Sequence, residues 1–142
     1  MRLLSRHVGS DNEMMELDFA LRRLEEDWQP FTPTVHSSPF LNFLHSAFLC
    51  QLAYLRLNAT ERSLRVNRVH GLCHCETSDF TLTRFLTSFA LGLDGVASED
   101  DLAYLRERCL ACPVSRNLPH VADKDTVVTL GSQATLPDGS PK

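Results

Sequence analysis

The cysteines are the residues of this sequence whose type and spacing could do chemistry. Five occur in 142 residues, at Cys50, Cys73, Cys75, Cys109 and Cys112. An odd number in a chain of this length does not suit a small domain held together by disulfides. In a reducing compartment, such cysteines serve as core residues, as metal ligands or as redox catalysts.

The proline directly behind Cys112 sets that cysteine apart. Pro113 falls where an amphipathic helical pattern is still running, and a proline in a helix interior costs about 3 kcal/mol or more. Ending the helix before Pro113 costs less free energy. Pro113 would then take the first position of a new short helix, and Cys112 would be the cap of that helix. Because a helix N-terminus lowers the pKa of a thiol, Cys112 is a candidate thiolate. The spacing alone is equally compatible with a small buried residue at a kink.

Zinc binding is a second chemistry open to the cysteines. Cys73 and Cys75 form one close pair, Cys109 and Cys112 form another, and four thiolates in two pairs can make a structural zinc cage. Such a site requires the strand that carries the first pair to cross the end of the helix that carries the second. The second pair could also act as a dithiol in its own right, although no thioredoxin-like strand precedes it. We favour a simpler interpretation, in which Cys73, Cys75 and Cys109 are small core residues.

A long helix around Cys50 is the strongest structural signal. Ser38 and Pro39 are typical of a helix start, and residues 40–59 are apolar on nearly all sides. A helix without a polar face must lie inside the protein or inside an oligomer. One stripe of it holds Phe43, Ala47, Cys50 and Tyr54.

Before this helix, the pattern predicts one shorter helix. Apolar residues recur at helical spacing from Leu17 to Trp28, and Pro30 and Pro33 would end that helix. Residues 1–11 are polar, and we expect them to be frayed.

After the long helix, the pattern changes to strands. Phe85 and Phe89 alternate with smaller or polar residues, and a hairpin is expected to join this strand to the one before it. Ser98 begins a capping box that opens a second helix, whose buried stripe includes Cys109 and Cys112. We expect strands over residues 64–75, 84–94 and 125–130, a hairpin connection over residues 76–83, and a disordered tail over residues 131–142.

Composition narrows the functional classes. The length suits one domain, and the balance of 14 basic and 18 acidic side chains is mildly acidic. This balance does not attract nucleic acid, and no stretch has the 18 or more apolar residues of a membrane span. We therefore expect a cytoplasmic protein that binds neither nucleic acid nor membrane.

Two segments resemble motifs of the OsmC and organic hydroperoxide resistance superfamily of thiol peroxidases. SPFLNFLHSAFLC, which ends at Cys50, is similar to the family's long helix with a reactive cysteine, and RCLACPVSRNL, which contains Cys112, is similar to its second-cysteine motif. The resemblance covers residues 37–130 and leaves residues 1–36 as an atypical N-terminal segment. It implies an α+β fold in which two chains intertwine, with long buried central helices packed together and antiparallel sheets wrapped outside.

The resemblance also implies a reaction. Cys50 would be the peroxidatic thiol and Cys112 the resolving thiol, so that peroxide converts Cys50 to a sulfenic acid and Cys112 condenses with it into a disulfide. An external dithiol reductant, often a lipoyl group in this family, would restore both thiols, and no bound cofactor is required. Phe40, Phe43 and Tyr54 would line the substrate pocket, which favours organic hydroperoxides.

The sequence departs from the family at the charged groups of this site. The family places an acidic residue shortly after the proline, whereas this sequence has Phe40 and Leu41 there. The family's arginine comes from an N-terminal strand, where only Arg22 and Arg23 are loose candidates. Without these charges, Cys50 should have a raised pKa and react slowly.

Three functions remain as hypotheses. The first is a thiol-dependent hydroperoxide reductase that acts as a homodimer. The alternative is a homodimer of the same fold that lacks peroxidase activity and binds a small apolar ligand. The third is a metal-binding structural protein.

Overall fold

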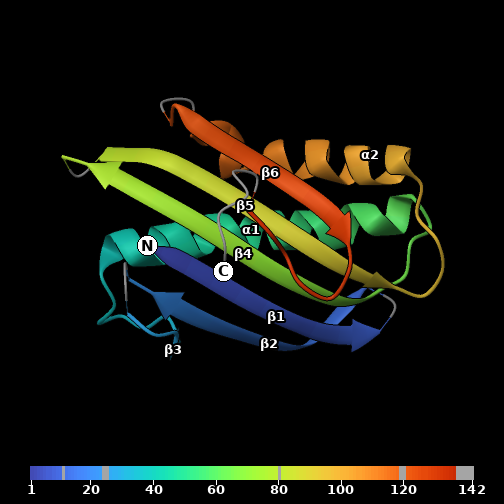
Figure 1. Cartoon of the computed structure of the whole chain (residues 1–142), viewed down its shortest axis with the longest axis horizontal. Coiled ribbons are helices and arrows are strands. Elements are labelled where there is room, and N and C mark those ends of the chain that lie inside the picture. Colours follow the sequence, from blue (N-terminus) through green and yellow to red (C-terminus); the bar gives the residue numbers. More distant parts are fainter. Residues whose placement is uncertain (11, 24–25, 80, 119–120, 137–142) are drawn as a thin grey trace.

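The computed structural model describes residues 1–10, 12–23, 26–79, 81–118 and 121–136. These residues form an α+β fold in which two helices lie against one face of a single sheet (Figure 1). The elements are β1 Arg2–Ser10, β2 Glu13–Arg22, β3 Gln29–Pro30, α1 Pro39–Glu61, β4 Val66–Ser78, β5 Thr81–Leu93, α2 Glu99–Leu110, the 3-10 turn η1 Ser115–Asn117 and β6 Asp123–Leu130.

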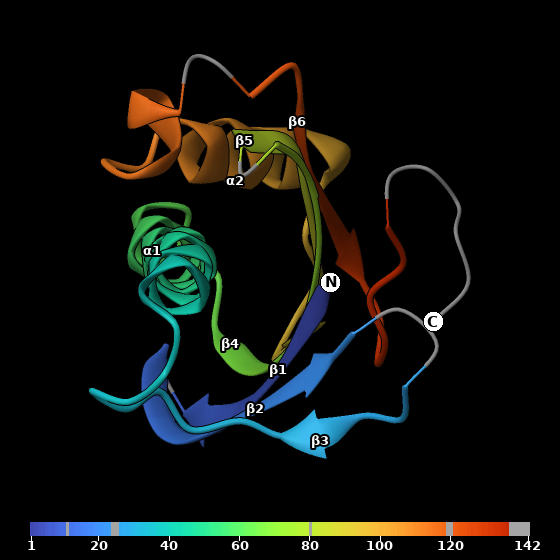
Figure 2. The same cartoon turned by 90° about the vertical axis from the view of Figure 1, so that its left-hand side faces the viewer.

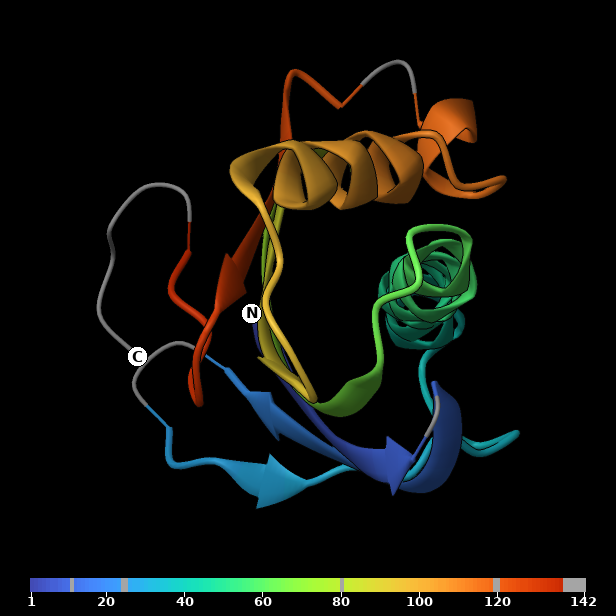
Figure 3. The ribbon, with the colours of Figure 1, turned by 90° about the vertical axis from the view of Figure 1, so that its right-hand side faces the viewer.

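The sheet has the strand order β3-β2-β1-β4-β5-β6. Neighbouring strands are antiparallel except for β5 and β6, which are parallel and are joined by a crossover through α2. The sheet curves around α1, and α2 lies beside α1 over the β5–β6 end (Figure 2). In both end-on views, the side of α1 that faces away from the sheet has no other described element against it (Figure 3).

α1 begins where the sequence predicts, with Pro39 in its first turn. The buried face of the helix packs on the concave side of the sheet, where Phe48 stacks on Phe89 with ring centroids 5.5 Å apart. Gly71 of β4 permits this close approach, because a Cβ there would lie 2.9 Å from the Phe48 ring and 2.4 Å from Ser5 Oγ. Because Gly71 has no side chain, α1 can pack closely against β4.

The expected β4–β5 hairpin and the start of α2 are confirmed. The strands are longer than predicted and the connection is shorter, because Glu76 to Ser78 pair with Thr81 to Arg84 rather than forming a loop. Ser98 and Asp101 form the predicted capping box, in which the Asp101 N–H donates to Ser98 Oγ at 3.1 Å. β6 also lies where it was expected.

The helical prediction for the N-terminal segment is wrong. Residues 2–10 and 13–22 form the β1–β2 hairpin, and β1 pairs with β4 from Arg2↔His74 to Val8↔Arg68. A spacing of four, as between Leu17 and Leu21, places two residues on one face of a strand as well as of a helix, and the partner strand decides between them. Leu24 lies outside the described residues. The N-terminal segment is therefore part of the same sheet as the rest of the chain.

The predicted disordered tail is also corrected as far as Leu136. Residues 131–136 return along the convex face of the sheet, where Ala134 and Leu136 are buried against Leu72 and Leu86. The Ala134 N–H donates to His70 Nδ1 at 2.8 Å. Two apolar residues in a polar segment are enough to anchor it, whereas residues 137–142 lie outside the described part of the chain.

No helix within the described residues is both long enough and apolar enough to cross a lipid bilayer.

Candidate functional site

Cys50 lies in the middle of α1 and is partly exposed, whereas the other four cysteines are buried and all five are free thiols. Its surroundings determine its acidity. Burial raises the pKa of Cys50 above the ordinary thiol value, and the hydrogen bond and charge of Cys112 raise it further, while the Val114 N–H lowers it by bonding to the sulfur. The direction is the one predicted for a thiol in an apolar helix that lacks a nearby cation.

Cys112 lies directly after α2, in a turn that presents its sulfur to α1. The Ser115 N–H donates to Cys112 Sγ at 3.3 Å, and the Arg116 N–H donates to the Cys112 carbonyl at 3.0 Å. The predicted break after α2 is present. The predicted cap is not, because η1 begins at Ser115 with Val114 at its N-cap position, although Cys112 Sγ accepts a backbone N–H from this turn.

The structure brings Cys50 and Cys112 together. The Cys112 side chain is among the groups that raise the pKa of Cys50, so the two residues are neighbours although 62 residues separate them in the sequence. Cys109 joins them from the last turn of α2, where its thiol donates to the Gln51 carbonyl at 3.6 Å. Burial raises the pKa of Cys109, and the charges of Cys112 and of Cys50 raise it further. We call Cys50, Cys109 and Cys112 the thiol cluster.

A buried glutamine ties the thiol cluster to the sheet. Gln51 is fully buried, and its Nε2 donates to Ser115 Oγ at 2.8 Å while its Oε1 accepts from the Thr87 hydroxyl at 2.7 Å. Thr87 in turn shares a hydrogen bond of 2.7 Å with Thr126. Sequence reasoning missed this residue, and the signal that could have found it is a neutral polar side chain in a helix that is otherwise apolar.

The three residues predicted to line a substrate pocket lie on the outer side of α1. Phe40 and Phe43 are 37% and 40% exposed, and their rings stack with centroids 6.3 Å apart. Tyr54 is partly buried one turn beyond Cys50. In the single chain these side chains form an apolar surface on the Cys50 side of the helix.

The arginine candidates do not reach Cys50. Arg22 lies at the end of β2 and stacks over the Trp28 ring at 5.0 Å, on the convex face of the sheet and away from α1. Arg23 is exposed just beyond it. Within the described residues, no lysine or arginine is among the causes that shift the pKa of Cys50. Lys124 contacts the turn from β6, where its Nζ donates to the Ser115 carbonyl at 2.8 Å.

The zinc hypothesis does not fit the structure. The sulfurs of Cys73 and Cys75 are 3.4 Å apart inside the core, but Cys109 and Cys112 meet Cys50 instead. In the described part of the chain, no three histidine, cysteine or acidic side chains are grouped so that they could hold a metal ion. His45 is buried against Phe19, at 4.4 Å between ring centroids, and burial lowers its pKa.

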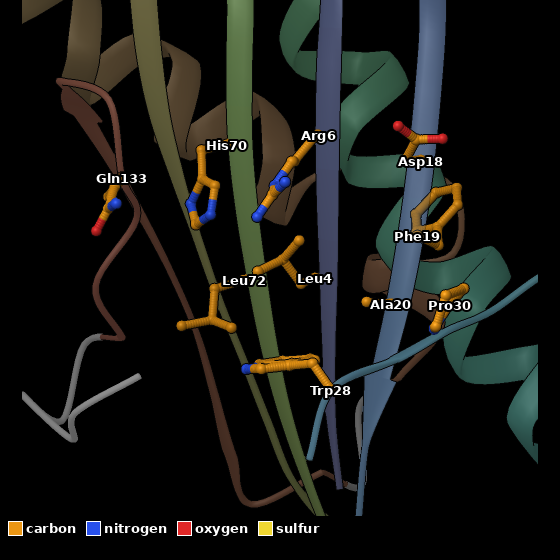
Figure 4. A pocket seen from close by; sticks show the side chains of 10 residues that line it. All are labelled: Leu4, Arg6, Asp18, Phe19, Ala20, Trp28, Pro30, His70, Leu72 and Gln133. Atoms are coloured by element: carbon orange, nitrogen blue, oxygen red, sulfur yellow. The ribbon is translucent and has the colours of Figure 1, made fainter.

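A cavity of about 520 Å³ lies on the other side of the sheet (Figure 4). Leu4 and Leu72 form part of its floor, Trp28 lies across one end, and Arg6 and His70 lie toward the other. None of the residues that line it is a cysteine. Because the sheet separates this cavity from α1, we assign the thiol chemistry to the cluster and not to the cavity.

A helix packed against a curved, mostly antiparallel sheet, with a crossover helix beside it, is the arrangement of an OsmC-like fold. The chain is similar to an OsmC-like hydroperoxide resistance protein from Jannaschia sp. CCS1, with a TM-score of 0.55 and 14% identity over 82% of this chain and 85% of that one. It is also similar to an OsmC-like protein from Mycoplasma pneumoniae, with a TM-score of 0.53 and 14% identity over 90% of this chain and 94% of that one. No protein-family model and no curated protein matches the sequence. The α+β fold that the two motifs predicted is confirmed for the single chain.

Replacing Gln51 tests its role in holding the Cys112 turn. Gln51→Leu should lower the free energy of unfolding by about 1–3 kcal/mol, because Ser115 Oγ loses its buried partner. It should also speed alkylation of Cys112 in the folded state, because the turn is no longer bonded to α1. Denaturant unfolding and mass spectrometry of alkylated peptides measure the two effects. The exposed Gln133→Leu is the control and should change stability by less than about 0.5 kcal/mol. Equal behaviour of both variants would contradict the role of Gln51.

The alkylation rate of Cys50 should reveal its raised pKa. Since only the thiolate reacts, the rate with iodoacetamide should rise about tenfold per pH unit and level off above the ordinary thiol value of about 8.5. In Cys112→Ala the midpoint should move down, because one cause of the raised pKa is removed, but burial should keep it above that value. A midpoint at or below the ordinary value in the unmodified protein would show that a basic group acts on Cys50 in solution.

Proposed function

We propose that this protein is a thiol-dependent reductase of organic hydroperoxides. The observation that carries the proposal is that the partly exposed Cys50 thiol has Cys112 as a neighbour, although the two residues come from distant parts of the sequence. A nucleophilic thiol needs access to its substrate, and a resolving thiol must be close enough to reach it without unfolding. The hydroperoxide resistance protein with a similar fold is consistent with this chemistry.

The reaction has three steps. The Cys50 thiolate attacks one oxygen of the hydroperoxide, which becomes a sulfenic acid on Cys50 while the alcohol leaves. The Cys112 thiol then condenses with the sulfenic acid, which releases water and forms the Cys50–Cys112 disulfide. A dithiol reductant, a lipoyl group or a protein that carries one, returns both sulfurs to thiols. A cytoplasmic location, where a reductant keeps thiols free, is part of this proposal.

Substrate preference follows from the surface around Cys50. Phe40, Phe43 and Tyr54 offer apolar contacts on the same side of α1 and no charged group. An alkyl or aryl hydroperoxide can bury its carbon skeleton against these rings, whereas hydrogen peroxide has none to bury. We therefore propose that Phe40, Phe43 and Tyr54 form one wall of the substrate site and that a second chain supplies the other.

The alternative function is a homodimer of this fold that binds a small apolar ligand without peroxidase activity. The observation that favours it is the raised pKa of Cys50, which leaves little thiolate at neutral pH. The two functions differ in one measurable property, the loss of thiols on exposure to peroxide.

Treatment of the reduced protein with cumene hydroperoxide tests the reductase. About one equivalent should remove two free thiols per chain, and the first disulfide formed should join Cys50 to Cys112. Cys50→Ser should abolish peroxide consumption. Cys112→Ser should stop after about one equivalent, with a sulfenic acid that dimedone labels. Thiol titration and peptide mass spectrometry provide the measurements. An unchanged thiol count in the unmodified protein would reject the reductase and support the alternative.

A substitution on the exposed side of α1 tests whether the protein forms a homodimer. Leu57 is 63% exposed two turns beyond Cys50, so Leu57→Asp should raise the dimer dissociation constant at least about tenfold. Val96→Asp is the control, because Val96 is 91% exposed but lies in the connection between β5 and α2. Sedimentation equilibrium distinguishes the two. A monomeric unmodified protein at micromolar concentration would contradict the proposed dimer.

A further inference from the structure

The thiol cluster contains one more sulfur than the proposed reaction uses. Cys109 and Cys112 lie one helical turn apart, and the Cys112 N–H donates to the Cys109 carbonyl at 3.2 Å. Cys109 Sγ points at α1, where it reaches the carbonyl of Gln51, the residue after Cys50. Cys112 is therefore within reach of a thiol on either side, Cys50 on α1 and Cys109 on α2.

We propose that Cys109 is a second resolving thiol, which attacks the Cys50–Cys112 disulfide and moves it within the chain. This inference rests on the proposed reductase function. The Cys109 sulfur attacks Cys112 Sγ, a Cys109–Cys112 bond forms and the Cys50–Cys112 bond breaks. Cys50 leaves as a thiolate and takes up the proton that Cys109 gives up. The exchange consumes no oxidant and no reductant, because one disulfide and one thiol are present before and after it.

The consequence is storage of oxidising equivalents. After the exchange Cys50 is again a thiol, so the chain can reduce a second hydroperoxide before any external reductant arrives. The stored disulfide joins two sulfurs that are completely buried, whereas Cys50 is partly exposed. An external dithiol therefore reaches the Cys50–Cys112 disulfide more easily than the Cys109–Cys112 disulfide. The reverse exchange re-forms the Cys50–Cys112 disulfide, which the external dithiol can then reduce.

Burial also limits how fast the exchange runs. Because the pKa of Cys109 is raised by burial, its thiolate is scarce and the exchange is slower than that of an exposed thiol. Proximity compensates for this, since groups held one helical turn apart react as if at a high local concentration. Cys73 and Cys75 do not enter this exchange, because they contact each other elsewhere in the core.

The stoichiometry of peroxide reduction without any reductant tests the exchange. The full-length reduced protein should consume about two equivalents of cumene hydroperoxide per chain, and Cys109→Ala should consume about one. Cys75→Ala is the matched control, because it removes another buried cysteine and should behave like the unmodified protein.

Peptide mapping of the unmodified protein provides a test that needs no variant. Trypsin releases residues 109–116 as the peptide CLACPVSR, so a Cys109–Cys112 disulfide lowers the mass of this one peptide by two hydrogens. A Cys50–Cys112 disulfide instead links it to the peptide that contains Cys50. After an acid quench, the internal disulfide should predominate in the unmodified protein, and the linked peptides should predominate in Cys109→Ala.

The two proposals fail in different ways. No peroxide consumption by the unmodified protein would overturn the reductase itself. Consumption of about one equivalent, with a Cys50–Cys112 disulfide that persists, would leave the reductase in place and overturn the exchange. A Cys75→Ala variant that also loses half its capacity would likewise overturn the exchange, because the loss would then not depend on the thiol cluster.

Discussion

The arrangement of the site depends on one buried carboxamide. Gln51 has no access to water, so both ends of its side chain need protein partners, and they find them in Ser115 and Thr87. A satisfied pair of such bonds fixes three elements relative to one another, namely α1, β5 and the turn after α2. Because the Ser115 amide also bonds to Cys112 Sγ, the position of the sulfur follows from that of the glutamine. The placement of Cys112 near Cys50 therefore depends on a polar hydrogen bond inside an apolar core.

The parts of the fold that sequence reasoning predicted are those with strong local signals. Pro39 marks the start of α1, the Ser98 capping box marks the start of α2, and the alternation around Phe85 and Phe89 marks β5. The β1–β2 hairpin has no such signal. Its residues fit a helix or a strand equally well in isolation, and only pairing with β4, about 70 residues away, selects the strand.

The site was predictable in a different way. Spacing alone left Cys112 undecided between a reactive thiol and a core residue, and the pairing with Cys50 came from resemblance to known motifs. Cys109 could not be recognised as part of the site, because its role appears only when the last turn of α2 lies against α1. For Gln51 the sequence offered only a polar residue in a largely apolar helix, and its partner Ser115 is 64 residues away. For the family's charged groups, the sequence showed only that they are missing, and the structure shows what lies in their place. Arg22 lies on the far face of the sheet, and Leu41 lies in the core. A carboxylate in place of Leu41 would be costly unless a cation accompanied it.

The pairing of β1 with β4 also affects how the chain assembles. During synthesis the β1–β2 hairpin emerges before α1 and β4, so one edge of β1 has no partner until they have followed it. A two-stranded hairpin is only marginally stable in water, and an unpaired edge can associate with other chains. The nascent protein therefore spends the translation of about 70 residues with its future central strand exposed. The chain is therefore most prone to aggregate while it is being synthesised, until β4 pairs with β1.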